Sequence, residues 1–251
     1  MAKKNPPNTI PSPVGESITR IDSREKVTGA AVYADDIQFG PGLLWARIVR
    51  SPHPHALIKS IDTSAAEKLP GVKAVVTGKD FPGLTGLYLR DRHIFCRDRV
   101  RYVGDPVVGI AAVSEEIAQK ATELVKVEYE VLPPVTDAEF GASPEAPVLH
   151  PDLGQYEVAN FIFPEAGTNK ANHFKIRKGD VDQVWDKCAA IVERKYKIPH
   201  IQHVPIEPHI VVAKMDETGN LTIWASSQSP FAQRHLIAIA LGISEGKIQV
   251  I

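Results

Sequence analysis

The sequence predicts an α+β protein with two folded units. Apolar stretches of strand length recur along the chain, as a continuous run at residues 107–113 and as strict alternation at residues 126–131. Short segments with capping residues lie between such stretches and indicate helices packed against sheets. The chain has 251 residues, 43% of them hydrophobic, and is therefore long enough for one large core or two ordinary ones.

Composition excludes several classes of partner. The 29 Lys and Arg residues balance 30 Asp and Glu residues, so neither nucleic acid nor a membrane is expected as a partner. No apolar run approaches the ~18 residues that span a bilayer, and the N-terminus lacks the apolar core of a secretion signal. Cys96 and Cys188 are far apart and lack metal-ligand spacing. We therefore expect a soluble, cytoplasmic protein.

The first unit is expected at residues 21–136, after an extended arm at residues 1–20. Ser64 and Glu67 have the spacing of a capping box for a short helix, and Ser114 is expected to begin a second helix with a buried apolar stripe. Pro133-Pro134 ends the unit. Strands are predicted at 43–50, 56–61, 72–77, 107–113 and 126–131.

A connecting segment at residues 137–177 has little periodicity but several aromatic residues, which predicts an ordered stretch packed across a neighbour. The second unit, residues 178–251, is predicted to begin with a short helix capped by Asp180. Strands are expected at 190–197, 210–215, 221–225 and 248–251, with a hairpin turn at 216–220 and a helix at 231–241 that ends at Gly242. The final strand stops without a turn or cap, so we expect this unit to lack its remainder.

Several stretches together resemble one enzyme family. In the first unit they are residues 26–36, 50–56 and 101–107, and in the second unit Lys178-Gly179-Asp180, residues 202–208 and the strand, loop and helix around Ser226-Ser227-Gln228. This pattern is similar to the molybdenum-binding subunit of the xanthine dehydrogenase, aldehyde oxidase and carbon monoxide dehydrogenase family. The resemblance implies an α/β-hammerhead domain, followed by the first, incomplete part of a molybdenum-cofactor-binding domain.

The resemblance also implies an activity, cofactors and partners. These enzymes hydroxylate a small-molecule substrate with oxygen from water and pass the electrons to iron–sulfur clusters. The expected cofactor is molybdenum bound to molybdopterin, as molybdopterin cytosine dinucleotide, with 2Fe–2S clusters and FAD on partner subunits. The family's Gly-Gly-Gly-Phe-Gly-Gly-Lys loop, its later pterin-binding segments and its glutamate base are absent. The chain is therefore expected to need the remaining part of the molybdenum-binding subunit and to be inactive alone.

Gln228 is the candidate catalytic and cofactor-binding residue, because the family's glutamine in this loop hydrogen-bonds an oxygen ligand of the metal. A neutral amide can donate such a bond without adding charge at the metal. The alternative is a loop glutamine that satisfies backbone groups at a turn from strand to helix.

Other polar residues have weaker signals. His203, Glu207 and His209 share one face of an extended chain and could bind a metal, but Pro205 and Pro208 make the segment irregular. The family has supporting residues there without a separate metal, so no metal ligand is predicted. His53 and His55 are expected to be hydrogen-bonded residues at a strand end. The basic residues within 90–101 alternate with Asp, which predicts a solvated or subunit-facing loop.

Two interpretations of the whole chain stay open. In the first it is part of a molybdenum hydroxylase, either a natural product of a split gene or a shortened form of a longer chain. In the second it is a non-catalytic assembly subunit or remnant that keeps the fold without the cofactor.

Overall fold

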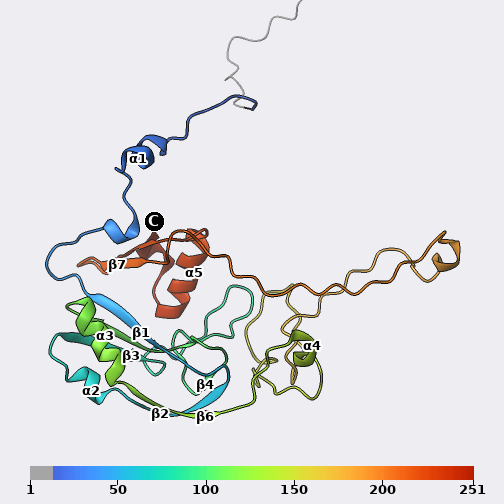
Figure 1. Cartoon of the computed structure of the whole chain (residues 1–251), viewed down its shortest axis with the longest axis horizontal. Coiled ribbons are helices and arrows are strands. Elements are labelled where there is room, and N and C mark those ends of the chain that lie inside the picture. The colour runs from blue at the N-terminus through green and yellow to red at the C-terminus, as the bar shows by residue number, and fades with distance from the viewer. Residues whose placement is uncertain (1–13) are drawn as a thin grey trace, which may run out of the picture.

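The computed structural model describes residues 14–251. These residues form three small sheets of three strands each, with order β1-β5-β3, β4-β2-β6 and β7-β8-β9. The first two sheets and their helices form the first unit, and the third sheet lies beside them with the C-terminus of the chain (Figure 1). The α+β class predicted from the sequence is confirmed.

Strand β5 (Pro106–Ala112) is the centre of the first sheet, antiparallel to both β1 (Trp45–Arg50) and β3 (Val72–Thr77). Its apolar run is buried almost throughout, as expected for a central strand. Gly109 lies opposite Ile48 on one side and Val76 on the other. A Cβ at this position would lie 2.6 Å from the Phe95 ring, so the strand needs a glycine there.

The second sheet is built on β2 (Ala56–Asp62), which pairs with β4 (Arg99–Val100) and β6 (Lys126–Val131). Helix α3 (Glu115–Leu124) packs on β1 and β5, and Ser114 caps it by accepting the N–H of Ile117, as predicted. The structure corrects the capping box that the sequence predicted for α2 (Ser64–Glu67). The N-cap is Thr63, whose hydroxyl donates to the Glu67 carboxylate, because the helix begins one residue earlier than the pattern indicated.

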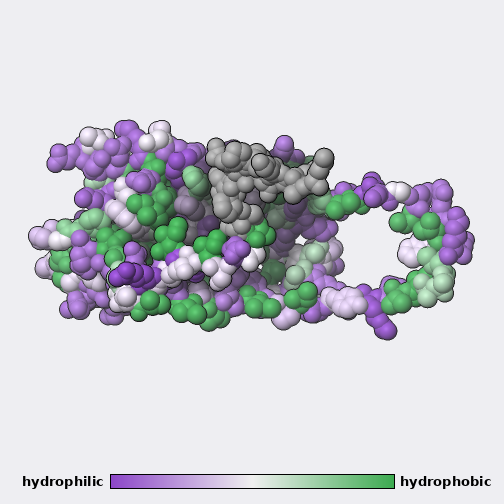
Figure 2. Space-filling view, turned by 90° about the horizontal axis from the view of Figure 1, so that it is seen from above, coloured by the Kyte–Doolittle hydropathy of each residue, from purple (hydrophilic) through white to green (hydrophobic). Residues whose placement is uncertain are grey.

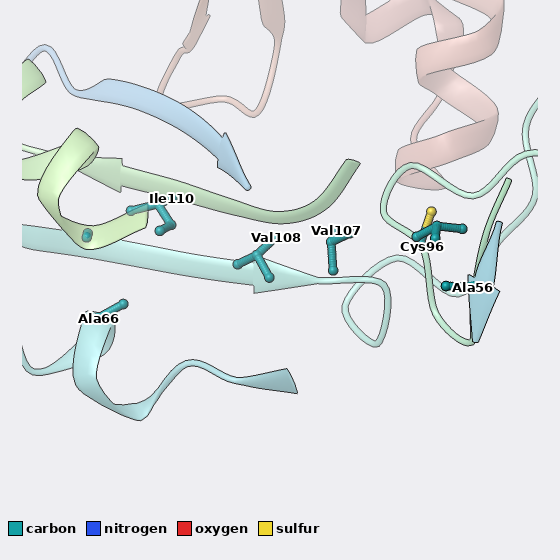
Figure 3. Close-up of a cluster of buried hydrophobic side chains, with 8 residues drawn as sticks. Ala56, Ala66, Cys96, Val107, Val108 and Ile110 are labelled. Carbon is teal, nitrogen blue, oxygen red and sulfur yellow. The ribbon is translucent and has the colours of Figure 1, made fainter. Parts of the chain in front are cut away.

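The core of the first unit lies between these two sheets and the short helix α2. Ala56, Val107, Val108 and Ile110 are buried together with Cys96, as the close-up in Figure 3 shows. Small and branched residues of this kind let the sheet and helix approach closely. The core therefore joins β5 to β2 and α2.

The connecting segment contacts the first unit through Arg90, which pairs with Glu157, and Arg101, which donates to the Leu149 carbonyl. Other polar contacts lie within the segment. It contains the short helix α4 (Ala138–Gly141), capped by Asp137. The Asn169 amide donates to the carbonyls of Gly141 and Pro147 and accepts the N–H of Leu149, with Leu153 buried nearby in sequence. The connecting segment at residues 137–177 stays a prediction, which these internal hydrogen bonds support.

In the second unit, β8 (Leu221–Ala225) pairs antiparallel with β7 (Val211–Met215) and parallel with β9 (Ile248–Val250). Helix α5 (Pro230–Leu241) makes the crossover between the parallel strands and packs on β9. Gly242 follows it with φ 66°, the predicted left-handed cap. The Phe39 ring lies 5.1 Å from that of Trp224 and links the two units.

Residues 171–209, here called the excursion, correct two predictions. The expected helix from Asp180 is only a single 3₁₀ turn, η2 (Trp185–Lys187), and the expected strand at 190–197 does not form. Every residue of the excursion is exposed. It runs out from the body as a long loop in Figures 1 and 2, with hydrophobic residues along it. Neither element forms because the described residues offer these segments no surface on which to pack.

Five short elements were not predicted. They are helix α1 (Ser23–Thr28), helix α4, strand β4 and the 3₁₀ turns η1 (Ala34–Asp36) and η3 (Glu245–Lys247). Residues 1–13 of the expected arm lie outside the described residues. The division into units at 21–136, 137–177 and 178–251 stays a prediction from the sequence.

Candidate functional site

The loop between β8 and α5 holds Gln228. Ser226 fixes the beginning of this loop: its hydroxyl accepts the N–H of Ile210 at 3.2 Å and lies 3.3 Å from the carbonyl of Pro208. Ser227 accepts the N–H of Ser229 at 3.1 Å, which closes a tight turn. The loop is therefore held at both ends by serine hydroxyls.

Gln228 itself is exposed at the bend of this loop. Within residues 14–251 its side-chain amide makes no hydrogen bond. The alternative role, in which it satisfies backbone groups at the turn, is therefore not what the geometry shows: Ser226 and Ser227 perform that task.

Gln228 lies two residues before the first residue of helix α5. Ser229 is the N-cap residue but provides no side-chain cap, and Pro230 is the first helical residue. The first N–H groups of a helix lack partners within the helix, and the N-terminus carries a partial positive charge. A residue with an amide donor thus directly precedes a helix N-terminus in the chain, and both kinds of group suit an oxygen-bearing, negatively polarised ligand.

His203, Glu207 and His209 lie in the exposed, extended stretch that leads into β7. Their stretch passes beside the Gln228 loop, because Pro208 and Ile210 both contact Ser226. Across residues 14–251, no group of three or more His, Cys, Asp or Glu side chains could hold a metal ion. The structure thus brings the backbone around His209 to the loop and does not form a His/Glu/His cluster.

His55 is confirmed as a hydrogen-bonded residue at a strand end. Only 1% of it is exposed, its Nδ1 lies 2.8 Å from the Pro133 carbonyl, and its Nε2 lies 3.0 Å from Nη1 of Arg99. Since a guanidinium can only donate, Nε2 accepts and Nδ1–H donates. His53 instead packs edge-on against the Tyr129 ring.

The basic stretch around residues 90–101 is more specifically engaged than its composition indicated. Arg90 pairs with Glu157, Arg99 with His55, and Arg101 donates from Nε to the Leu149 carbonyl at 2.9 Å. Arg101, His93 and His150 also line a cavity that sequence reasoning missed. Only the fold brings these residues together, so no local motif could have identified it.

Comparison with known proteins defines the class to which this fold and loop belong. Residues 28–133 match the family model for the aldehyde oxidase and xanthine dehydrogenase a/b hammerhead domain, and residues 162–251 match the model for the molybdopterin cofactor-binding domain. The chain belongs to this family of molybdenum oxidoreductases and corresponds to the N-terminal part of their molybdenum-binding subunit.

Individual relatives support this assignment. The chain is 37% identical to a probable xanthine dehydrogenase subunit of Bacillus subtilis, over 94% of this chain and 30% of that protein. It is 31% identical to the nicotinate dehydrogenase large molybdopterin subunit of Eubacterium barkeri, over 95% of this chain and 53% of that one. The chain thus spans between about a third and about half of the length of these relatives.

Solved structures agree. The aldehyde oxidoreductase of Desulfovibrio gigas superposes with a TM-score of 0.78 at 29% identity, covering 92% of this chain and 26% of that one. Carbon monoxide dehydrogenase of Oligotropha carboxidovorans gives 0.79 at 31% identity, over 93% and 30%. Both predicted domains, a hammerhead and part of a molybdenum-cofactor-binding domain, are confirmed.

Proposed function

We propose that this chain forms one wall of the active site of a molybdopterin-dependent hydroxylase or dehydrogenase, which oxidises a C–H substrate or carbon monoxide with oxygen from water. The observation that carries the proposal is the match of residues 162–251 to the cofactor-binding domain, in which the Gln228 loop presents an amide without a protein partner. Substrate identity stays open, because the described loop does not define a substrate pocket.

The excursion supports the second part of the proposal, that a further polypeptide segment completes the site. Large apolar side chains along it are exposed, among them Ile198 (83%) and Ile206 (102%). Val204 has φ 49°, which a β-branched residue rarely adopts unless its surroundings enforce it. A monomer seldom leaves so much apolar surface uncovered. We infer that the rest of a molybdenum-binding subunit packs on residues 171–209.

The residues present fit the cofactor. Gln228 offers a neutral N–H donor just before the N-terminus of α5 in the chain, and the pair would hold an oxygen ligand of the metal without adding a full charge. When bound, the cofactor would supply two-electron redox chemistry. This chain's own contribution is to position that donor through the Ser226 and Ser227 hydrogen bonds.

The remaining assignments extend the family relationship. We propose that the cofactor is molybdopterin cytosine dinucleotide and that the partners are an iron–sulfur subunit carrying 2Fe–2S clusters and an FAD subunit. A small molecule is the proposed substrate, the cytoplasm is the proposed location, and neither nucleic acid nor a membrane takes part. None of the helices in residues 14–251 combines the length and the apolar character of a membrane span.

Co-purification with the products of neighbouring genes tests the proposal. We expect the chain alone to contain no molybdenum and to be inactive, and the complex to contain molybdenum and to oxidise a substrate of this family. Metal content is measured by elemental analysis. A complex that assembles without molybdenum would instead support the non-catalytic assembly subunit, and near-stoichiometric molybdenum in the lone chain would contradict the need for a further segment.

Gln228→Ala tests the residue assignment in the assembled enzyme. Loss of one preorganised hydrogen-bond donor at a catalytic centre lowers the rate about 10²–10³-fold when charge develops on the acceptor. For Gln228→Ala we expect the turnover rate to fall by about 10²-fold or less. Molybdenum content and unfolding should stay unchanged, because an exposed amide contributes little packing. The control is Gln119→Ala on the exposed face of α3. Full turnover of the Gln228 variant with full metal content would rule out this role.

A further inference from the structure

A cavity lies between the first unit and the connecting segment, and no residue of the Gln228 loop lines it. It is a cavity of about 150 Å³, between the stretch that precedes β5 and His150 of the connecting segment. Its walls include His93, Arg101, Tyr102 and Asp91. Tyr102 is 52% exposed, so the cavity is accessible from solvent. We call it the Arg101 cavity.

Arg101 is held in this cavity from two directions. Its backbone N–H donates to Asp105 at 2.9 Å, and its side-chain Nε donates to the Leu149 carbonyl at 2.9 Å. Its side chain has no carboxylate within ion-pair distance in the part of the chain that the structure describes. The guanidinium is therefore fixed in place while its two terminal amino groups keep their donors available.

The two acidic residues that line the cavity, Asp91 and Asp105, do not pair with the Arg101 guanidinium. Asp105 is buried and accepts the Arg101 N–H. Burial and then the charge of Asp105 raise the pKa of both the Cys96 thiol and the Tyr102 hydroxyl. Asp91 lies 3.9 Å from His150 and 4.0 Å from Arg92. Both carboxylates thus interact with groups other than the Arg101 guanidinium.

The two histidines act as uncharged hydrogen-bonding groups. Burial lowers the pKa of His93, and burial followed by the charge of Arg101 lowers the pKa of His150. Nδ1 of His93 is buried and has no hydrogen-bond partner among residues 14–251. Because even a water molecule cannot reach this nitrogen, it faces the protein interior, and other atoms of His93 line the cavity.

We propose that the Arg101 cavity binds a small oxyanion, a carboxylate or a phosphate, on the forked donors of Arg101. A planar guanidinium with two parallel donors matches both kinds of anion. A cation is disfavoured, since the cavity's side chains are not among any metal-binding group in residues 14–251.

Titration of the full chain with inorganic phosphate and, separately, with acetate tests this site. The readout is calorimetry together with the NMR signals of the His93 and His150 rings. We expect saturable binding of at least one anion, and the stronger of the two identifies the class of ligand. Arg101→Gln should weaken binding about tenfold or more, because it removes a charge-assisted fork.

Arg97→Gln is the matched control, with the same change of charge on an exposed residue of the same stretch that does not line the cavity. Thermal unfolding checks that each variant is folded. If Arg101→Gln does not fold, Arg101→Lys keeps the charge, loses the planar fork, and should still weaken binding. Absence of saturable binding to either anion, or equal loss in the Arg97 and Arg101 variants, overturns the proposal.

Discussion

His55 is a buried residue whose two ring nitrogens are both engaged, and it connects three parts of the first unit. Its ring bonds Pro133 and Arg99, and its carbonyl accepts the N–H of Leu132 at 2.9 Å. It therefore joins the beginning of β2 to β4 and to the chain after β6. Removing it would leave a buried carbonyl and a guanidinium without their partner.

His55→Ala should lower the free energy of unfolding by about 2–3 kcal/mol, through the unsatisfied groups and the cavity left behind. Urea denaturation followed by circular dichroism measures the loss. His53→Ala is the control, since His53 contributes one ring contact at 5.0 Å and should cost less than about 1 kcal/mol. Equal losses would mean that the His55 hydrogen bonds contribute little.

At the level of single residues, the sequence predicts only part of the candidate site. The strand, serine-containing loop and helix around Gln228 could be recognised because they are contiguous. The hydrogen-bond partners of Ser226 could not be recognised from the sequence, because Pro208 and Ile210 lie in a separate segment that leads into β7. His93, Arg101 and His150 are likewise assembled by long-range packing, which no local pattern records.

Among the elements, those with a partner inside the chain were predictable and those without one were not. Strands β5, β6, β7 and β8 follow the predicted stretches because their apolar residues have sheets to face. Residues 190–197 carry Val192 and Tyr196, which would share one face of a strand, yet no strand within residues 14–251 pairs with them. A β-ladder needs two strands, whereas the β-propensity of one segment does not show whether a partner strand is available. Strand β4 and helix α1 are too short to show a period.

The excursion should be the first internal site of proteolysis in the isolated chain. Its backbone is exposed throughout, whereas residues 45–131 lie mainly in paired strands and a packed helix. Limited digestion with trypsin, followed by mass spectrometry, should show cuts between Lys175 and Lys197 before any cut between Trp45 and Val131. In the assembled complex these early cuts should disappear. Resistance of the excursion in the isolated chain would show that it is already covered.

For the whole molecule, the burial of Cys96 links stability to alkaline pH. Burial, together with the Asp105 carboxylate, raises the pKa of the Cys96 thiol far above its ordinary value. The unfolded chain then loses this proton near pH ~8.5 while the folded chain retains it. The stabilising contribution is complete below that pH and is lost as the pH rises above it.

Between about pH 8.5 and 9.5 the free energy of unfolding should therefore fall, by up to about 1.4 kcal/mol per pH unit. Cys96→Ala should remove this slope, although it also lowers stability at neutral pH by leaving a small void. Denaturation at a series of pH values measures both effects. Cys188→Ala, at an exposed thiol, should leave the slope unchanged. A slope that persists without Cys96 would assign the effect to other groups.

The position of the excursion in the chain also bears on how the protein is made. A ribosome releases the chain from its N-terminus, and domains generally fold as units in that order. Residues 28–170, which include both sheets of the first unit, emerge before the excursion and before the third sheet. During synthesis the first core can thus close early, while the apolar side chains of residues 171–209 stay exposed against everything else in residues 14–251. We expect those residues to be the stretch that a chaperone holds until they are covered.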